Sequence, residues 1–283
     1  MSIAERTNGL LLPLKKNEQP MILNMHNNKS KLIKTSPKVL INPEKKIALL
    51  WSAKAGSAFI TKWFFYQMGV LTKAEEHSDW IHNYRKEIYK TPTYKQALEN
   101  LIDKPNEYYT IKLVRNPYTR AVSSYVQSLL MLKINHPAAQ ELMTREGKLP
   151  LKEKYSFAEF LDALTFADIE NDNMHWRCQT HPTERKGIIT INTLIKLEAS
   201  AGILNHLEQQ LNLKPTEPSE FAASSHHNKK VESNEQSFIG NAPFSVAVRR
   251  NTPPYDCFYN AELKKKVQEI YKEDFERYQY AAE

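Results

Sequence analysis

The chain has 283 residues and a formal net charge of +7, and hydrophobic residues make up 41% of it. These values are ordinary for a globular protein and allow one large domain with a buried core. No apolar run approaches the roughly 18 residues that cross a bilayer, and we find no signal peptide, so we expect no membrane span. The two cysteines are too few for a disulfide framework, so we expect a reduced protein in the cytoplasm.

The first half of the sequence predicts a strand followed by a helix. Residues 1–40 are polar and interrupted, which indicates an N-terminal arm that is only partly ordered. The compact apolar run over 46–52 predicts a strand that is buried on both faces, as in a parallel sheet. Apolar residues at helical spacing then extend from Phe59 to Met68, and Gly69 fits the C-terminal cap of that helix.

A second strand and helix follow the same order. Residues 108–114 predict a strand that stops at Arg115, and Asn116 and Pro117 suit the cap and the first residue of the next helix. Because strand, turn and helix occur twice, we expect an α/β fold with ligands at the C-terminal ends of the strands. The later predicted elements are a helix opened by a capping box at Ser156, a strand over 188–197, a helix over 199–211, a long irregular stretch over 214–256 and a closing helix over 263–278.

The segment Lys54-Ala55-Gly56-Ser57 lies where the first predicted strand meets its helix. The first turn of a helix presents free N–H groups and a partial positive charge, so it binds anions. Lys54 adds a charged side chain and Gly56 permits a tight turn. In a nucleotide-hydrolysing P-loop the lysine follows the second glycine, an order that is absent here. The segment therefore predicts a phosphate-type anion site unlike that of an ATPase.

A second candidate site begins at Arg115, at the end of the second predicted strand. From there its guanidinium can face an anion with two donors. Ser123 follows eight residues later, two turns into the helix. Taken alone, Ser123 could be an ordinary small helix residue, but together with the Lys54 segment the pair indicates two phosphate contacts.

These two segments resemble the 5′-phosphosulfate and 3′-phosphate loops of sulfotransferases that use 3′-phosphoadenosine 5′-phosphosulfate (PAPS). The family's loops read roughly Pro-Lys-x-Gly-Ser/Cys-Ser/Thr and Arg-Asp/Asn-Pro-x-x-Arg-x-x-Ser-x-Tyr, and the second is nearly complete over residues 115–125. Further similarity occurs over residues 156–161, 173–177, 195–198 and 270–275. The resemblance spans about residue 45 to the end. It is closest to the carbohydrate sulfotransferase branch, and the chain looks like a soluble, bacterial-type member.

The resemblance implies a single P-loop-like domain over 41–283, after the arm over 1–40, with a central, mainly parallel sheet flanked by helices. It implies an enzyme that moves a sulfuryl group from PAPS to a hydroxyl of an acceptor, expected to be a carbohydrate or a glycan-containing molecule, without a metal. Two positions depart from the family pattern. Ala53 replaces its proline, and Ala58 replaces the hydroxyl residue after Gly-Ser.

The resemblance also assigns site residues. The donor-binding residues are Lys54, Ala55, Gly56, Ser57, Ala58, Phe59, Arg115 and Ser123. Lys54 would in addition neutralise the leaving oxygen, and Arg115 with Ser123 would hold the 3′-phosphate. A histidine is the natural general base near neutral pH, and two remain open. His82 lies between the two loops and His175 in the Asn-Met-His-Trp stretch, and we favour His82.

Three alternatives stay under consideration. A P-loop-type kinase of a small molecule requires a Gly-Lys-Ser/Thr order and a metal-binding aspartate at a strand end, and neither is present. A nucleic-acid-binding module would gather its basic residues with aromatics, whereas here they are dispersed among 32 acidic residues, so we expect no nucleic-acid partner. A catalytically inactive, glycan-binding relative remains open because of Ala53 and Ala58.

Overall fold

The computed structural model describes residues 27–147, 150, 152, 154–222, 237–243 and 252–282. The strands are β1 (Leu40–Asn42), β2 (Ile47–Trp51), β3 (Tyr109–Val114) and β4 (Thr193–Lys196). The helices are α2 (Ser57–Gln67), α3 (Leu71–His77), α4 (Tyr84–Lys90), α5 (Pro92–Asp103), α6 (Pro117–Lys133), α7 (Pro137–Thr144), α8 (Phe157–Leu164), α9 (Pro182–Arg185), α10 (Ser200–Gln210), α11 (Ser219–Ala222), α12 (Ala261–Ile270) and α13 (Lys272–Tyr278). Short 3-10 helices are η1 (Ile81–Asn83), η2 (Pro105–Glu107), η3 (Arg145–Gly147), η4 (Leu197–Ala199) and η5 (Tyr255–Phe258).

The strands form one sheet in the order β1-β2-β3-β4. β2 and β3 are parallel, with Leu49 opposite Ile111, and β3 and β4 are parallel, with Leu113 opposite Ile195. Only the three-residue β1, which the sequence did not predict, is antiparallel to its neighbour. The structure thus confirms an α/β domain with a mainly parallel sheet. Because β2 and β3 run the same way, the segments that follow them leave from the same edge.

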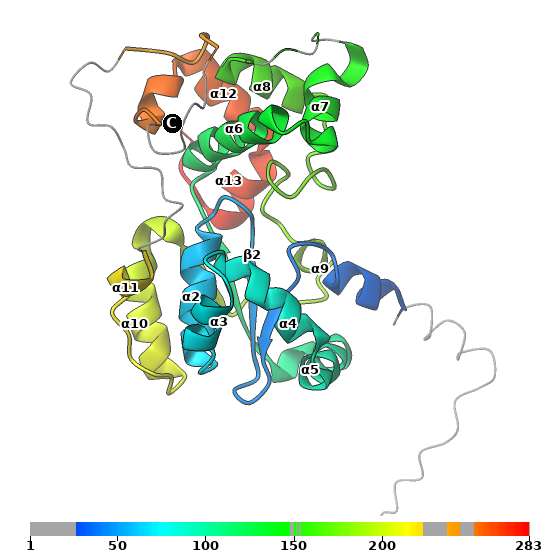
Figure 1. Ribbon diagram of the computed structural model, residues 1–283, viewed down its shortest axis with the longest axis vertical. Coiled ribbons are helices and arrows are strands. Elements are labelled where there is room, and N and C mark those ends of the chain that lie inside the picture. The colour runs from blue at the N-terminus through cyan, green and yellow to red at the C-terminus, as the bar shows by residue number, and fades with distance from the viewer. Residues whose placement is uncertain are drawn as a thin grey trace, which may run out of the picture.

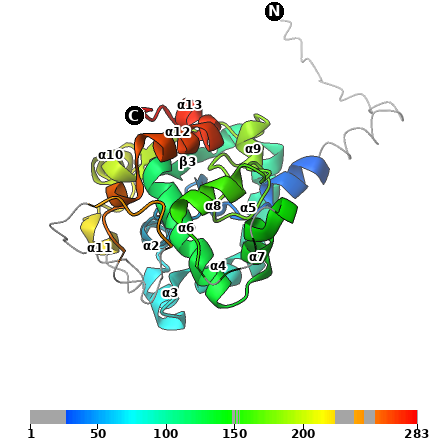
Figure 2. The ribbon, with the colours of Figure 1, turned by 90° about the horizontal axis from the view of Figure 1, so that it is seen from above.

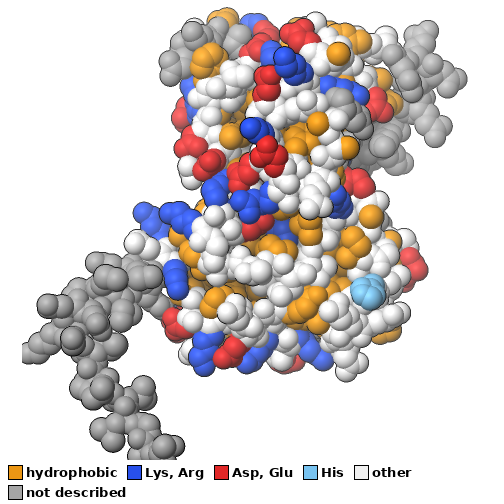
Figure 3. All heavy atoms as spheres, turned by 180° about the vertical axis from the view of Figure 1, so that it is seen from behind, with side chains coloured by type: hydrophobic (Ala, Val, Ile, Leu, Met, Phe, Trp, Pro, Cys, Tyr) orange, Lys and Arg blue, Asp and Glu red, His pale blue; other side chains and the backbone are white. Residues whose placement is uncertain are grey.

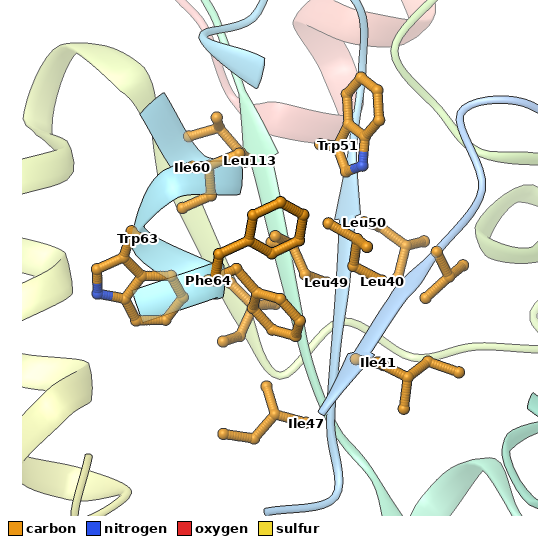
Figure 4. Packing of buried hydrophobic residues seen from close by; sticks show 14 of the residues in the cluster. Leu40, Ile41, Ile47, Leu49, Leu50, Trp51, Ile60, Trp63, Phe64 and Leu113 are labelled. Atoms are coloured by element: carbon orange, nitrogen blue, oxygen red, sulfur yellow. The ribbon is translucent and has the colours of Figure 1, made fainter. Parts of the chain in front are cut away.

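Helix α2 packs its apolar side on the sheet. Figure 4 shows Phe64 of α2 on the same side of the sheet as Leu49 of β2, and Ile60 of α2 beside Leu113 of β3. Every residue of β2 is buried, as its unbroken apolar run predicted. Trp63 is also fully buried, and its indole Nε1 donates to the carboxylate of Glu208 in α10 at 2.7 Å. The polar atom of this large side chain is thereby satisfied.

The core consists of two hydrophobic clusters. The first surrounds the sheet with α2, α5 and α10, and the second joins α6, α8 and α12. The first cluster lies in the lower part of Figure 1 and the second in the upper part, and Figure 2 shows α6, α8 and α12 next to one another from above. β3 belongs to the first cluster and α6 to the second, so the short turn between them passes from one to the other. The candidate phosphate loops therefore lie where the two clusters meet.

Two predicted elements are shorter than expected. The predicted strand over 188–197 is reduced to β4, because the N–H groups of Ile188 and Ile189 donate to the carbonyl of Thr183 instead of pairing in the sheet. The predicted closing helix is two helices, α12 and α13, separated at Tyr271. Tyr271 is fully buried in the second cluster, and its hydroxyl donates to the carbonyl of Trp176 at 2.7 Å.

The segment before the sheet contacts the rest of the molecule. Residues 27–33 are helical, and Ile33 is buried in the first cluster. The guanidinium of Arg177 donates to the carbonyl of Ser36, which ties this segment to the stretch around His175. In the part of the chain that the structure describes, no helix is long and apolar enough to cross a membrane.

Candidate functional site

The turn between β2 and α2 has the geometry of an anion-binding helix terminus. Gly56 caps α2 with φ +83°, in the left-handed region that favours glycine. A Cβ at this position would lie 2.6 Å from Cδ1 of Leu197, so there is also no room for a side chain. No side chain caps α2, and its first turn contains no acidic residue. Its first N–H groups are therefore directed at the site without a competing carboxylate.

Arg115 brings the end of β3 to the same turn. Its Nη1 donates to the carbonyl of Lys54 at 3.1 Å, and its Nε donates to the hydroxyl of Thr119 at 2.9 Å. The guanidinium carbon lies 5.3 Å from the centre of the Tyr255 ring. Lys54 and Arg115, 61 residues apart in the chain, are thus in direct contact. Viewed from behind, lysine and arginine side chains gather at the narrow middle of the molecule (Figure 3).

Helix α6 supplies the third side of the site. Nζ of Lys54 donates to Oε1 of Gln127 at 3.2 Å. Ser123 precedes Gln127 by one helical turn and is 8% exposed, so the two lie on one face of α6. The structure therefore brings Lys54, Arg115 and the helix face of Ser123 together. Gln127 is not among the predicted site residues, although its spacing of four residues from Ser123 places it on the same face of α6.

His82, which belongs to η1, lies close to the first residue of α2. Its Nε2 is 3.2 Å from Oγ of Ser57, the first residue of that helix. The imidazole is stacked with the Trp51 ring, with centres 5.8 Å apart and planes 3° from parallel. The ring of Trp80, which is 40% exposed, meets His82 edge-on at 4.9 Å. The His82 imidazole is therefore held in place beside the turn that contains Lys54.

His175 is a second histidine near the same loop. Burial lowers the pKa of His175 to about 4, and the nearby Lys54 and Arg120 side chains act in the same direction. Its Nδ1 is buried without a hydrogen-bond partner in the described residues, while its backbone N–H donates to the side chain of Asn173 at 3.0 Å. His175 is consequently neutral at pH 7.

Gln179, which the sequence did not single out, joins the ends of β2 and β3. Its Oε1 accepts from the N–H of Arg115 at 2.9 Å and from the hydroxyl of Ser52 at 3.2 Å. Its Nε2 donates to the carbonyl of Arg115 at 2.8 Å. The amide is 2% exposed and uses both of its ends. The position of Arg115 is therefore fixed by a side chain that is 64 residues away in the chain.

Arg120 and Asp274 extend this buried network. Nε of Arg120 donates to the carbonyl of Ala53 at 3.1 Å, and its Nη2 donates to the carbonyl of Arg177 at 2.7 Å. A carboxylate oxygen of Asp274 accepts the N–H of Gln179 at 2.7 Å, and the other lies 3.9 Å from Nη1 of Arg120. Although Arg120 falls within the second loop motif, its guanidinium is fully buried and supports the backbone of the first loop.

A parallel sheet with a basic side chain and a helix N-terminus at the ends of neighbouring strands defines a class of proteins that bind anionic ligands. Residues 37–281 match the sulfotransferase family, so the chain belongs to that family. It is thus a transferase that moves a sulfuryl group to a hydroxyl-bearing acceptor. No curated protein and no solved structure matches the chain. Among the described residues, no three His, Cys, Asp or Glu side chains form a group that could hold a metal ion.

Proposed function

We propose that this sulfotransferase uses PAPS as its donor and acts on a hydroxyl of a carbohydrate. The observation that carries the proposal is the contact between the two loops, in which Nη1 of Arg115 donates to the carbonyl of Lys54 at 3.1 Å. Two cationic side chains and a helix N-terminus are thereby concentrated at one edge of the sheet. A ligand with phosphates at both ends of an adenosine would match this pair of charges.

The residues present fit such a donor. Helix α2 begins after Gly56 with no side-chain cap and no acidic residue in its first turn, which suits a 5′-phosphate. One turn further into α2, Oγ1 of Thr61 is buried and has no hydrogen-bond partner in the described part of the chain. Ala58 offers only its N–H group at the position where the family has a hydroxyl. Compared with the family pattern, the site therefore keeps the backbone N–H donors of the first loop and has one side-chain hydroxyl fewer.

PAPS would supply a sulfuryl group activated by its phosphate leaving group. In the proposed mechanism the ammonium of Lys54 stabilises negative charge on the leaving oxygen. Arg115 and Ser123 bind the 3′-phosphate, which separates a bisphosphate from plain nucleotides. His82 accepts the proton of the acceptor hydroxyl. Its contact with Ser57 keeps it beside the first loop.

The proposed carbohydrate acceptor rests on the aromatic side chains beside His82. Trp80 is 40% exposed and lies edge-on to the His82 ring, so part of its surface is open to a ligand next to the proposed base. A sugar ring packs well on such an aromatic face because its C–H groups are apolar. The resemblance to the carbohydrate sulfotransferase branch points the same way.

The donor is tested by thermal unfolding in the presence of adenosine 3′,5′-bisphosphate, AMP and ATP. We expect the bisphosphate to raise the midpoint most, since a ligand that binds the folded state stabilises it by mass action. Arg115→Ala should weaken bisphosphate binding by about 10- to 100-fold, the usual worth of hydrogen bonds to a charged group.

Lys133→Ala is the matched control, because it removes a positive charge from the exposed end of α6. This variant should bind the bisphosphate as the wild type does. An equal response to AMP and the bisphosphate would contradict the proposed donor, and a preference for ATP would favour the kinase alternative. Bisphosphate binding without transfer to any acceptor would favour the inactive relative.

A further inference from the structure

The short helix η4 follows β4 and contacts both candidate phosphate loops. Its first residue, Leu197, packs over the first loop, since a Cβ on Gly56 would lie 2.6 Å from Cδ1 of Leu197. Its next residue, Glu198, accepts the N–H of Asn116 in the second loop through Oε1 at 2.9 Å. Because β2, β3 and β4 are parallel, their C-terminal ends meet at one edge of the sheet. The segment after β4 therefore connects the two loops at that edge.

The contact with Glu198 fixes one peptide group of the second loop. The carbonyl of Arg115 accepts from Nε2 of Gln179 at 2.8 Å, and the N–H of Asn116, in the same peptide group, donates to Glu198 at 2.9 Å. Both polar atoms of this peptide are thus bound by side chains from distant segments. The peptide joins Arg115 to the N-cap residue of α6, so its orientation sets the direction in which the guanidinium leaves the chain.

A tyrosine beyond the last helix holds the carboxylate of Glu198. The hydroxyl of Tyr280 donates to Oε2 of Glu198 at 3.0 Å, while Oε1 accepts from Asn116. Burial raises the pKa of Tyr280 above its ordinary value of 10.0, and the charge of Glu198 acts in the same direction, so the phenol is protonated at pH 7 and donates. Glu198 is exposed, so water competes for it, and the bond from Tyr280 keeps the carboxylate oriented towards Asn116.

The segment that contains Tyr280 is itself fixed to β4 and α13. Nζ of Lys196, the last residue of β4, donates to the carbonyl of Gln279 at 2.9 Å and lies 4.5 Å from the centre of the Tyr280 ring. The N–H of Tyr280 donates to the carbonyl of Phe275 in α13 at 3.1 Å. The position of the Tyr280 hydroxyl is therefore set by a strand and a helix that are both part of the folded core.

We propose that Glu198 is a positioning residue of the donor site, held by Tyr280, and that it fixes the peptide after Arg115 for binding of the 3′-phosphate. The inference rests on the proposed function, since it assumes a donor with a 3′-phosphate. A carboxylate bonded to this loop repels a bound phosphate, so its charge by itself would weaken donor binding. The contribution of Glu198 is the hydrogen bond from Asn116, which arranges the loop before the donor arrives.

The test measures, by calorimetric titration, the ratio of the affinity for adenosine 3′,5′-bisphosphate to the affinity for AMP. Only the bisphosphate has the group that Arg115 would bind, so a general loss of folded protein cancels in the ratio. Glu198→Ala should lower the ratio by about three- to tenfold, because a hydrogen bond to a charged acceptor is lost at an exposed position. Tyr280→Phe should lower it by about twofold, since Glu198 then keeps its bond to Asn116 and loses its support.

Glu198→Gln separates position from charge. The amide keeps an oxygen that accepts from Asn116 and removes the negative charge, so this variant should keep or exceed the wild-type ratio. Tyr109→Phe is the matched control for Tyr280→Phe. The hydroxyl of Tyr109 is hydrogen-bonded to that of Thr193 at 2.7 Å, where β3 and β4 begin, so its loss affects the same two strands at the opposite end of the sheet. The control should leave the ratio unchanged.

The affinities of the wild type separate this inference from the proposed function. If the wild type binds the bisphosphate and AMP equally, the proposed donor is wrong and the inference is overturned with it. If the wild type prefers the bisphosphate and Glu198→Ala keeps that preference, only the positioning role is wrong. A Glu198→Gln ratio as low as that of Glu198→Ala also overturns the inference. Glu269→Ala, at an exposed position of α12, is the control for Glu198→Ala and should behave as the wild type.

Discussion

The two histidines beside the Lys54 turn are both poorly exposed and differ in their contacts. His175 is largely buried near Lys54 and Arg120, and its pKa is lowered to about 4. A base with such a low pKa is neutral at pH 7 and accepts a proton poorly. The imidazole of His82 is fixed by Trp51 and by Ser57, at the start of α2. These surroundings favour His82 as the group that accepts the proton of the acceptor hydroxyl.

His82→Ala should therefore reduce kcat by about 100-fold or more, the usual contribution of a general base, while the protein still binds adenosine 3′,5′-bisphosphate. His175→Gln should reduce it less. The pH dependence of kcat/KM provides the control. If His175 were the base, activity would fall only as the pH drops through about 4. If kcat/KM of the wild type falls in this way and that fall is absent in His175→Gln, the assignment of the base to His82 is wrong.

Some site residues could be predicted from the sequence and others could not. Lys54 and Arg115 each follow a buried strand directly, and strand ends in parallel sheets converge, so local pattern was sufficient. Gln179 carries no such signal. It acts on Arg115 across 64 residues. This contact cannot be derived before the chain is folded.

At the scale of elements, the buried amide of Gln179 sets the position of the strand ends. It bonds to both backbone polar groups of Arg115 and to the hydroxyl of Ser52. β2 and β3 are thus linked just beyond their last paired residues. The turn with Lys54 begins only a few residues later, so a change at Gln179 should reach the anion site without touching a ligand.

Gln179→Ala should weaken the binding of adenosine 3′,5′-bisphosphate by about tenfold and destabilise the fold by about 1–3 kcal/mol, because it leaves buried polar groups of Arg115 and Ser52 unpaired. Calorimetric titration of the folded variant measures the first effect and urea unfolding the second. Gln210→Ala, at the exposed end of α10, is the matched control and should change neither. A destabilised variant with unchanged affinity would make Gln179 merely structural.

Elements were predictable where one local signal dominated. The apolar run of β2 and the Asn116–Pro117 start of α6 are confirmed. The strand over 188–197 was overestimated, because hydrogen bonds from Ile188 and Ile189 to Thr183 compete with sheet pairing. β1 has three residues and depends on β2 for all of its pairing, so its own sequence contains no sufficient signal.

At the scale of the whole molecule, Asp274 connects the C-terminal helix α13 to the strand ends. It is fully buried, and it accepts the N–H of Gln179. Burial raises the pKa of Asp274 from its ordinary value of 3.8 to about 6, although the nearby Arg120 guanidinium acts in the opposite direction. The final helix and the candidate site therefore share one titratable group.

This shared group gives the protein a testable pH dependence. Between pH 3.8 and about 6 the folded state holds the Asp274 proton more tightly than the unfolded state, so this residue contributes less stability as the pH rises. Asp274→Asn should remove that contribution. Urea unfolding at several pH values measures it as the difference in unfolding free energy between wild type and variant.

His175 and His181, whose pKa values are lowered to about 4 and about 3, have the opposite effect. They make the folded state less stable as the pH falls below the ordinary histidine value, and they do so in both proteins. They therefore cancel in the difference. Asp103→Asn, at an exposed position, is the control and should leave the profile unchanged. A wild-type-minus-variant difference that does not decrease from pH 4 to 7 would contradict the raised pKa of Asp274.

The hydrogen bond from Arg115 to the carbonyl of Lys54 has a consequence for how the donor's binding energy is used. In the proposed complex one guanidinium would touch a phosphate far from the reacting bond and, at the same time, the peptide that carries the lysine at that bond. Attraction gained at the remote phosphate can then hold Lys54 in the position needed in the transition state. Part of the binding energy of the remote phosphate would then increase kcat instead of tightening the binding of the donor.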